Sequence, residues 1–158
     1  MKKFLTYSYW AILLFYFGLL IDTVFIARDA KRSINLVPFD MIQTQGFSLN
    51  VYGNILMFVP LGIYAALLFK QDTFRKTLAI VIGASLFIEI VQFIFARGAT
   101  DIDDVILNTA GGVIGIIIYL LFRLVFKTKE KIQNALTILS LIIGVPMVGL
   151  VIMLIFAN

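Results

Sequence analysis

Apolar residues fill five long segments of this chain, and polar residues gather in the stretches between them. Each segment has about 20 residues or slightly more, which is the length that an α-helix needs to cross a hydrocarbon layer of ~30 Å. The pattern therefore predicts an all-α, polytopic membrane helix bundle with about five transmembrane helices, in one domain over residues 1–158. The predicted spans are Phe4–Ile26, Ser48–Phe69, Thr77–Ala96, Asp104–Phe126 and Ala135–Ala157.

Two of these segments need a choice between interpretations. A cleavable signal peptide is the alternative for the first, but its apolar stretch is long and lacks a clear small-residue cleavage site, so a span is favoured. Pro60 interrupts the second segment. We expect it to kink the helix rather than end it, because neighbouring helices can satisfy the freed carbonyl.

The composition supports lipid as the main solvent. Of the 158 residues 61% are hydrophobic and 14% charged, and a soluble domain this small could not bury so much apolar surface. The absence of His removes the commonest general base and metal ligand near neutral pH, and the absence of Cys excludes disulfides. The net charge of +4 is explained by loops at the membrane surface, so no nucleic-acid partner is expected.

The basic residues predict the orientation of the chain. Nine of the thirteen fall on the cytoplasmic side if the N-terminus is inside and the C-terminus outside. These nine are Lys2, Lys3, Lys70, Arg75, Lys76, Arg123, Lys127, Lys129 and Lys131. The expected localisation is the cell membrane, as a multi-pass protein.

The stretch EIVQFIFARGATDIDDVILNTAGG, residues 89–112, is then an outward-facing corner between the third and fourth spans. Glu89 lies eight residues before Arg97, about 12 Å deeper along a helix. Asn108 lies one turn below Asp104, and Asn54 lies near the outer end of the second span. Polar groups from three spans are therefore predicted to meet in the outer half of the membrane.

The third span carries one polar stripe, formed by Ser85, Glu89, Gln92 and Ala96. Acidic residues within a span usually face the bundle interior and mark a functional pathway. The alternative for Glu89 is a protonated carboxyl that only bonds a neighbour, and the alternative for Gln92 is an amide that joins two helices.

The fourth span carries a second stripe, formed by Asp104, Asn108, Gly111 and Gly115. The glycines predict close approach of another helix, which serves packing within the chain or a homodimer. Asp104 and Asn108 are placed to meet the polar groups of that neighbour.

The aspartates of the corner have several interpretations. Thr100 and Asp103 resemble a capping box at the start of the fourth helix. Arg97 is the expected cationic partner of the carboxylates, and its guanidinium would suit a phosphate or carboxylate ligand. A divalent cation such as Mg²⁺ or Ca²⁺, held by Asp101, Asp104 and Asn108, is the alternative, and no other cofactor is expected.

The first outer segment, about residues 27–50, is long for a plain connection, which favours a lid or another functional role. Its apolar patch INLVPFDMI is expected to fold back into the outer mouth of the bundle, and Pro38 to stiffen the turn.

Three blocks in series, RSINLVPFD, GNILMFVPLG and EIVQFIFARGATDIDDVILNTAGGVIG, resemble those of VanZ-like membrane proteins. The resemblance runs from about residue 32 to residue 121 and leaves 135–157 as an additional terminal span. It implies an outward-facing role in the envelope, because the family's namesake contributes to teicoplanin resistance in Gram-positive bacteria. The motif positions it maps are Arg32, Asn35, Pro38, Phe39, Asn54, Pro60, Gly62, Glu89, Gln92, Arg97, Asp101, Asp104, Asn108 and Gly112.

The leading hypothesis is a non-enzymatic envelope protein whose outward polar cleft binds an amphipathic ligand. Membrane lipid, a lipid-linked cell-wall intermediate and the acyl tail of a lipoglycopeptide all have the required chemistry. One alternative is a Mg²⁺-dependent enzyme that acts on a polyprenyl phosphate, with Glu89 as general base. The other is a small lipid transporter or flippase, although no inverted repeat is visible in the sequence.

Overall fold

The computed structural model describes residues 2–22, 33–96 and 98–157, and within this part the chain is almost entirely helical. The predicted all-α bundle is confirmed, and two strands of three residues are added to it. The elements are α1 (Lys2–Ile21), β1 (Ser33–Asn35), α2 (Asp40–Gln45), α3 (Leu49–Ala66), α4 (Thr73–Phe95), β2 (Ala99–Asp101), α5 (Ile102–Val125) and α6 (Lys129–Ala157).

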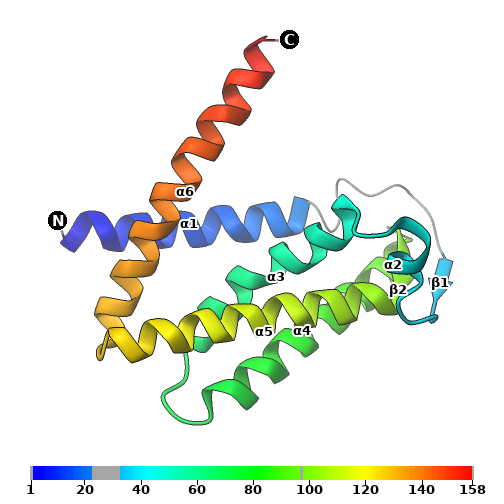
Figure 1. Ribbon diagram of the computed structural model, residues 1–158, viewed down its shortest axis with the longest axis horizontal. Coiled ribbons are helices and arrows are strands. Elements are labelled where there is room, and N and C mark those ends of the chain that lie inside the picture. Colours follow the sequence, from blue (N-terminus) through cyan, green and yellow to red (C-terminus); the bar gives the residue numbers. More distant parts are fainter. Residues whose placement is uncertain (1, 23–32, 97, 158) are drawn as a thin grey trace.

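Helices α1, α3, α4 and α5 run back and forth between two ends of the molecule (Figure 1). At one end α1 and α4 finish, α3 and α5 begin, and β1, α2 and β2 collect; we call this the strand end. The opposite end, which we call the basic end, holds the turns 67–72 and 126–128 with Lys70 and Lys127, and Arg75 and Arg123 lie in the adjoining turns of α4 and α5. Under the predicted orientation the strand end faces outward.

Four helices of the described chain are long and apolar enough to cross a membrane: Lys3–Ile21, Leu49–Ala66, Thr73–Phe95 and Ile102–Val125. They match the first four predicted spans, with boundaries that shift by up to four residues where both ends are described. Pro60 lies inside α3, which continues to Ala66, as expected for a proline that does not end its helix.

The fifth predicted span, 135–157, lies within α6. This helix crosses α1 and extends away from the other helices (Figure 1). The side chains after Pro146, apart from Met153, lie outside the described set. The number of five spans and the sides on which the termini lie therefore remain predictions.

Helices α3 and α5 are in main-chain contact through glycine. A methyl group at Gly111 would overlap the carbonyl oxygen of Ile55, and one at Gly115 would overlap that of Val59. The close neighbour predicted for the glycine stripe is thus α3 of the same chain. A homodimer remains a prediction, but the glycine face suggested for it is already used within the chain.

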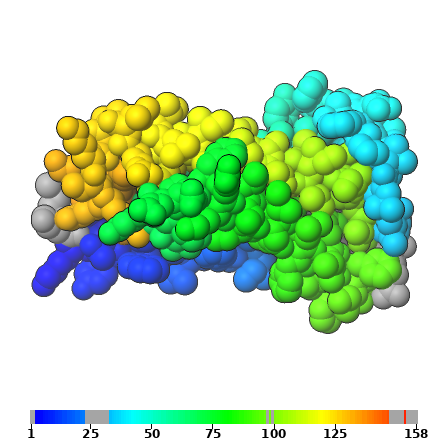
Figure 2. Space-filling view, turned by 90° about the horizontal axis from the view of Figure 1, so that it is seen from below, coloured from blue at the N-terminus to red at the C-terminus, as the bar shows by residue number. Residues whose placement is uncertain are grey.

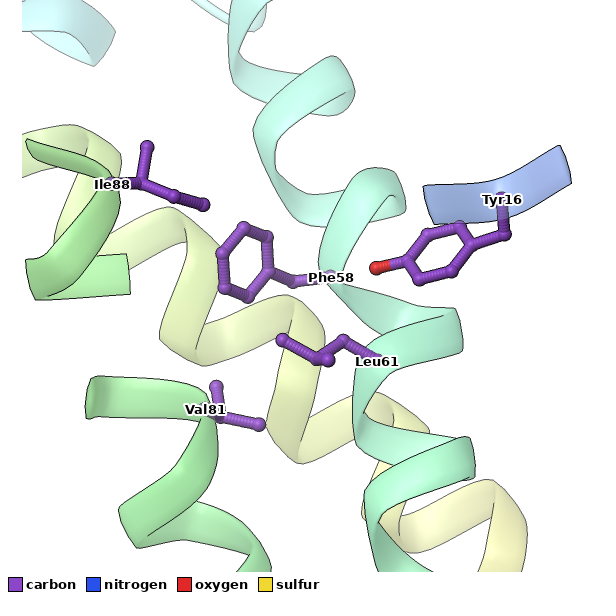
Figure 3. Close-up of a cluster of buried hydrophobic side chains, with 5 residues drawn as sticks. All are labelled: Tyr16, Phe58, Leu61, Val81 and Ile88. Carbon is purple, nitrogen blue, oxygen red and sulfur yellow. The ribbon is translucent and has the colours of Figure 1, made fainter. Parts of the chain in front are cut away.

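A hydrophobic cluster joins α1, α3 and α4 (Figure 3). Phe58 of α3 lies between Ile88 of α4 and Tyr16 of α1, and the Tyr16 hydroxyl donates to the main-chain oxygen of Met57 at 2.9 Å. Much of the outer surface is apolar instead of polar: Phe87, for example, is 64% exposed. Large exposed apolar surfaces are unfavourable in water, so lipid is the solvent that this surface fits.

Candidate ligand-binding site at the strand end

The two short strands bring the first outer segment to the charged corner. They pair in parallel, with Asn35 opposite Asp101. The Asn35 amide nitrogen donates to Asp40 at 3.0 Å and to Asp101 at 3.3 Å, while its oxygen accepts from the Val37 main-chain N–H at 3.1 Å. Asn35, a predicted site residue, therefore ties β1, α2 and β2 together. Figure 2 shows the segment with β1 and α2 (cyan) at one end of the molecule, next to the yellow-green residues around β2.

Asp103 fixes the start of α2. One carboxylate oxygen accepts from the main-chain N–H of Phe39 at 2.5 Å and the other from that of Met41 at 2.7 Å. Phe39 stands at the N-cap position of α2 with φ +62°, and its side chain has no oxygen that could cap the helix. The carboxylate of Asp103, only 2% exposed, supplies this function from another helix.

The prediction that Thr100 is the N-cap of α5 is wrong by one residue. Asp101 is the N-cap, and its side chain accepts from the Asp103 main-chain N–H at 2.9 Å. The Thr100 hydroxyl instead donates to the main-chain oxygen of Glu89 at 3.4 Å. This difference arises because β2 holds Thr100 in an extended conformation beside α4. Asp103 is then free to bind the outer segment.

Glu89 is buried two turns before the end of α4, near the strand end. Its side chain is 4% exposed, and Oε2 accepts from the Asp101 main-chain N–H at 3.1 Å. Ser85 and Gln92 of the same stripe are fully buried. The stripe therefore faces protein and not lipid, as predicted from its spacing.

The polar residues of α5 meet those of α3 and α4. The Asn54 amide donates to Asp104 at 2.5 Å, and the Asn108 amide donates to the Ser85 hydroxyl at 3.0 Å. Asp104 is one turn from Asn108, and Glu89 is one turn from Ser85. The two bonded pairs thus lie at neighbouring depths, and the convergence predicted for three helices is present in the fold.

Sequence reasoning missed two members of this arrangement as site residues. Asp103 was assigned only to the helix cap, and Ser85 only to the stripe. A signal for Asp103 exists in the sequence: a short helix that begins after Pro38-Phe39 has no capping side chain of its own and needs an acceptor from elsewhere. Arg97, the expected cationic partner of the carboxylates, and Arg32, a predicted site residue of the first outer segment, lie outside the described residues.

The donor set gives no support to a preformed metal site. Within residues 2–22, 33–96 and 98–157, no three His, Cys, Asp or Glu side chains are grouped so that they could hold an ion. Asp101 and Asp104 accept bonds from N–H groups, and Asn108 uses its amide on Ser85. Mg²⁺ or Ca²⁺ at Asp101, Asp104 and Asn108 stays an untested prediction.

A groove of about 320 Å³ opens on one side of this network. Its wall comes from β1 and the residue after it, from α4, from β2 and from the start of α5, and it is almost entirely apolar. The apolar lining residues are Ile34, Leu36, Leu86, Ile90, Phe93, Ile102 and Val105, and the others are Glu89, Thr100 and Asp101. Such a groove can hold a hydrocarbon chain beside a buried carboxylate.

The first outer segment folds back less completely than predicted. Its main chain is bound to the bundle through Asp103, and Ile34 and Leu36 line the groove. However, Leu36 is 70% exposed and Phe39 51% exposed, so these side chains do not fill the mouth of the bundle. Hydrogen bonds to the main chain, and not apolar burial, hold the segment in place.

Comparison with known proteins gives the family. A family model described as VanZ/LLP1 matches residues 4–123, which extends the resemblance seen in the sequence to α1. Protein VanZ of Enterococcus faecium is 44% identical over 89 residues, 56% of this chain. The chain covers 53%, about half, of that relative's length. No solved structure matches this chain. The chain therefore belongs to the VanZ/LLP1 family, and its four membrane-length helices make it a membrane protein of that family.

Proposed function

We propose that this protein acts in the cell envelope of a Gram-positive bacterium and contributes to resistance against teicoplanin-type glycopeptides and lipoglycopeptides. It does so by binding an amphipathic or lipid-linked ligand in the groove at the strand end. The family relationship supports the resistance role, and the predicted orientation places the groove in the outer half of the membrane.

The groove is the observation that carries this proposal. Its wall of Leu86, Ile90 and Phe93 is open to the surroundings of α4, where lipid chains lie in a membrane. Glu89 and Asp101 also line the groove, but Glu89 is almost fully buried and both carboxylates accept N–H bonds from the protein, so the groove itself fits the hydrocarbon part of the ligand. At about 320 Å³ the groove is near the lower limit of the roughly 300–1,000 Å³ typical of small-molecule sites, so it fits part of a lipid chain.

Binding is favoured over catalysis by the way the carboxylates are used. Asp103 accepts two main-chain N–H bonds, and Asp104 accepts the Asn54 amide. Carboxylates that hold the fold together are poorly placed to collect Mg²⁺ for phosphate chemistry. Neither the enzyme nor the transporter hypothesis has an observation of its own in the described residues.

The experiment compares two tryptophan substitutions on the same helix. Ile90→Trp fills the groove, whereas Ile94→Trp adds the same side chain at an exposed position of α4 that does not line it. In a strain that lacks the native gene, the wild type and Ile94→Trp are expected to restore the minimal inhibitory concentration of teicoplanin. Ile90→Trp is expected to leave the strain sensitive, at equal abundance in the membrane.

A second readout tests the ligand directly. Membranes with each variant are crosslinked with a photoactivatable polyprenyl-diphosphate-linked cell-wall precursor and, separately, with a photoactivatable teicoplanin. Ile90→Trp is expected to reduce labelling by one of these probes and Ile94→Trp to leave it unchanged. Equal teicoplanin susceptibility with and without the gene would refute the resistance role, and equal labelling of both variants would refute the groove as the site.

A further inference from the structure

A second cavity lies at the basic end, on the far side of the molecule from the groove. It has a volume of about 250 Å³ and is bordered by four cationic side chains, Lys70, Arg123, Lys127 and Lys129. Its apolar and aromatic floor includes Leu67, Tyr119 and Ile132, which are buried where α3, α5 and α6 meet. The pocket thus lies between the ends of α3 and α5 and the start of α6. Helix α4 contributes through Thr73, which bonds Arg123.

The charge of the pocket is unbalanced. Among the residues that the structure describes, no aspartate or glutamate lines it; the nearest acids in the sequence, Asp72 and Glu130, are not on its wall. Like charges around a common cavity repel one another, and a bound anion offsets that repulsion. The four cations are exposed, so an anion can reach them.

Two hydrogen bonds hold the Arg123 guanidinium at the pocket. One guanidinium nitrogen donates to the Thr73 hydroxyl at 3.5 Å and the other terminal nitrogen to the main-chain oxygen of Lys70 at 3.3 Å. A guanidinium has five N–H donors, so this anchoring leaves donors for a ligand. Its planar fork matches the oxygens of a phosphate group.

The position of the pocket indicates where the anion comes from. It lies where three membrane-length helices end or begin, at the level of lipid head groups. Leu124 and Val125, 79% and 72% exposed, follow Arg123 directly and offer apolar surface for acyl chains. Basic pockets between transmembrane helices on the cytoplasmic side bind anionic head groups.

We propose that the basic pocket binds the phosphate group of an anionic phospholipid, with the head group between the four cations and the acyl chains along the end of α5. A cavity of about 250 Å³ is smaller than a typical site for a whole drug-sized ligand, but it can hold a head group. The chemistry is that of a phosphate ester, so a soluble phosphate compound is the other source to be tested. This site does not depend on the ligand of the groove.

The test uses the purified full-length chain in detergent and native mass spectrometry. Phosphatidylglycerol and phosphatidylcholine with the same acyl chains are added, and the retained lipid is measured. The pocket variant is Arg123→Gln/Lys127→Gln/Lys129→Gln. The control, Lys3→Gln/Arg75→Gln/Lys131→Gln, removes the same number of charges from residues that do not line the pocket. Each cation near an anionic head group contributes about fivefold in affinity, so the pocket variant is expected to lose roughly 100-fold.

Selective retention of phosphatidylglycerol by the wild type and the control, with loss in the pocket variant, supports the proposal. Equal loss in the control, or equal retention of phosphatidylcholine, overturns it. Displacement of the lipid by millimolar inorganic phosphate supports the phosphate site but assigns it to a soluble phosphate compound. If the triple variant does not purify, the single changes Lys127→Gln and Lys129→Gln at exposed positions are expected to lose about fivefold each, and no loss overturns the proposal.

Discussion

The contact between α3 and α5 makes a sharp prediction for Gly111→Ala. The new Cβ would lie 2.8 Å from the carbonyl carbon of Ile55 and 3.1 Å from its Cα. Carbon atoms prefer separations of about 3.5–4.0 Å, so α3 has to move away by about 1 Å. Because the obstacle is main chain and not a flexible side chain, no change of rotamer can relieve the overlap.

The size of the effect follows from two contributions. Overpacking of a close contact costs about 1–3 kcal/mol. The same movement stretches the bond between Asn54 and Asp104, which is 2.5 Å long and lies two turns away from Gly111 along α5, and a lost interhelical bond costs about 0.6–1 kcal/mol more. Alanine also favours the helix by up to about 1 kcal/mol, which offsets part of this cost, so Gly111→Ala is expected to lower the free energy of unfolding by about 1–3 kcal/mol.

The matched control is Gly83→Ala on α4, where a methyl group meets no described heavy atom within 4 Å. This change is expected to be neutral or to stabilise the protein by up to about 1 kcal/mol, because alanine favours the helix.

The assay uses the absence of cysteine from the chain. Cysteines introduced at the exposed Leu68 and Leu124 are labelled with a pair of fluorophores, and energy transfer between the turn after α3 and the last turn of α5 is followed during titration with dodecyl sulfate. Unfolding curves that coincide for Gly111→Ala and Gly83→Ala would refute the glycine contact.

Two further predictions concern the polar network. Asp103→Asn leaves one acceptor for two main-chain N–H groups, and a lost bond to a charged group costs about 1.5–3 kcal/mol. Hydrogen exchange at the start of α2 is therefore expected to rise at least about tenfold. Unchanged exchange would contradict the anchoring role of Asp103. Asn108→Ala and Ser85→Ala are each expected to reduce the free energy of unfolding by about 0.6–1 kcal/mol. The double variant is expected to lose less than the sum, because both changes remove the same hydrogen bond. Strictly additive losses in the same titration would show that the bond contributes nothing.

The helices could be predicted because apolar length alone identifies them. The burial of Glu89 and the proximity of Asn54, Asp104 and Asn108 also followed from the sequence, since helical spacing puts these residues on common faces and antiparallel helices bring them to the same end of the bundle.

The parallel strand pair could not be predicted in the same way. Residues 33–35 and 99–101 are far apart in sequence, each strand has only three residues, and no alternation of apolar and polar positions can develop over so short a length. The function of Asp103 was missed for a related reason: its bonds go to main-chain groups of Phe39 and Met41, and the only sequence signal for them is the lack of a capping side chain at the start of α2. Leu36 and Phe39 are exposed because hydrogen bonds, and not the expected apolar contacts, hold this segment on the bundle.

The wall of the groove that β1 contributes depends on which residue of β1 pairs with which residue of β2, and not on the residue types of the strand alone. Successive strand residues point to opposite sides, so Ile34 faces the groove while Asn35 reaches Asp101. Deleting one residue between the strand and Pro38 would invert that order, turning an amide toward the hydrocarbon surface and an isoleucine toward the aspartates. The shape that this membrane protein offers to lipid is thus determined by the count of residues in a short exposed segment, and natural length changes there would alter what it can bind even if every transmembrane residue were kept.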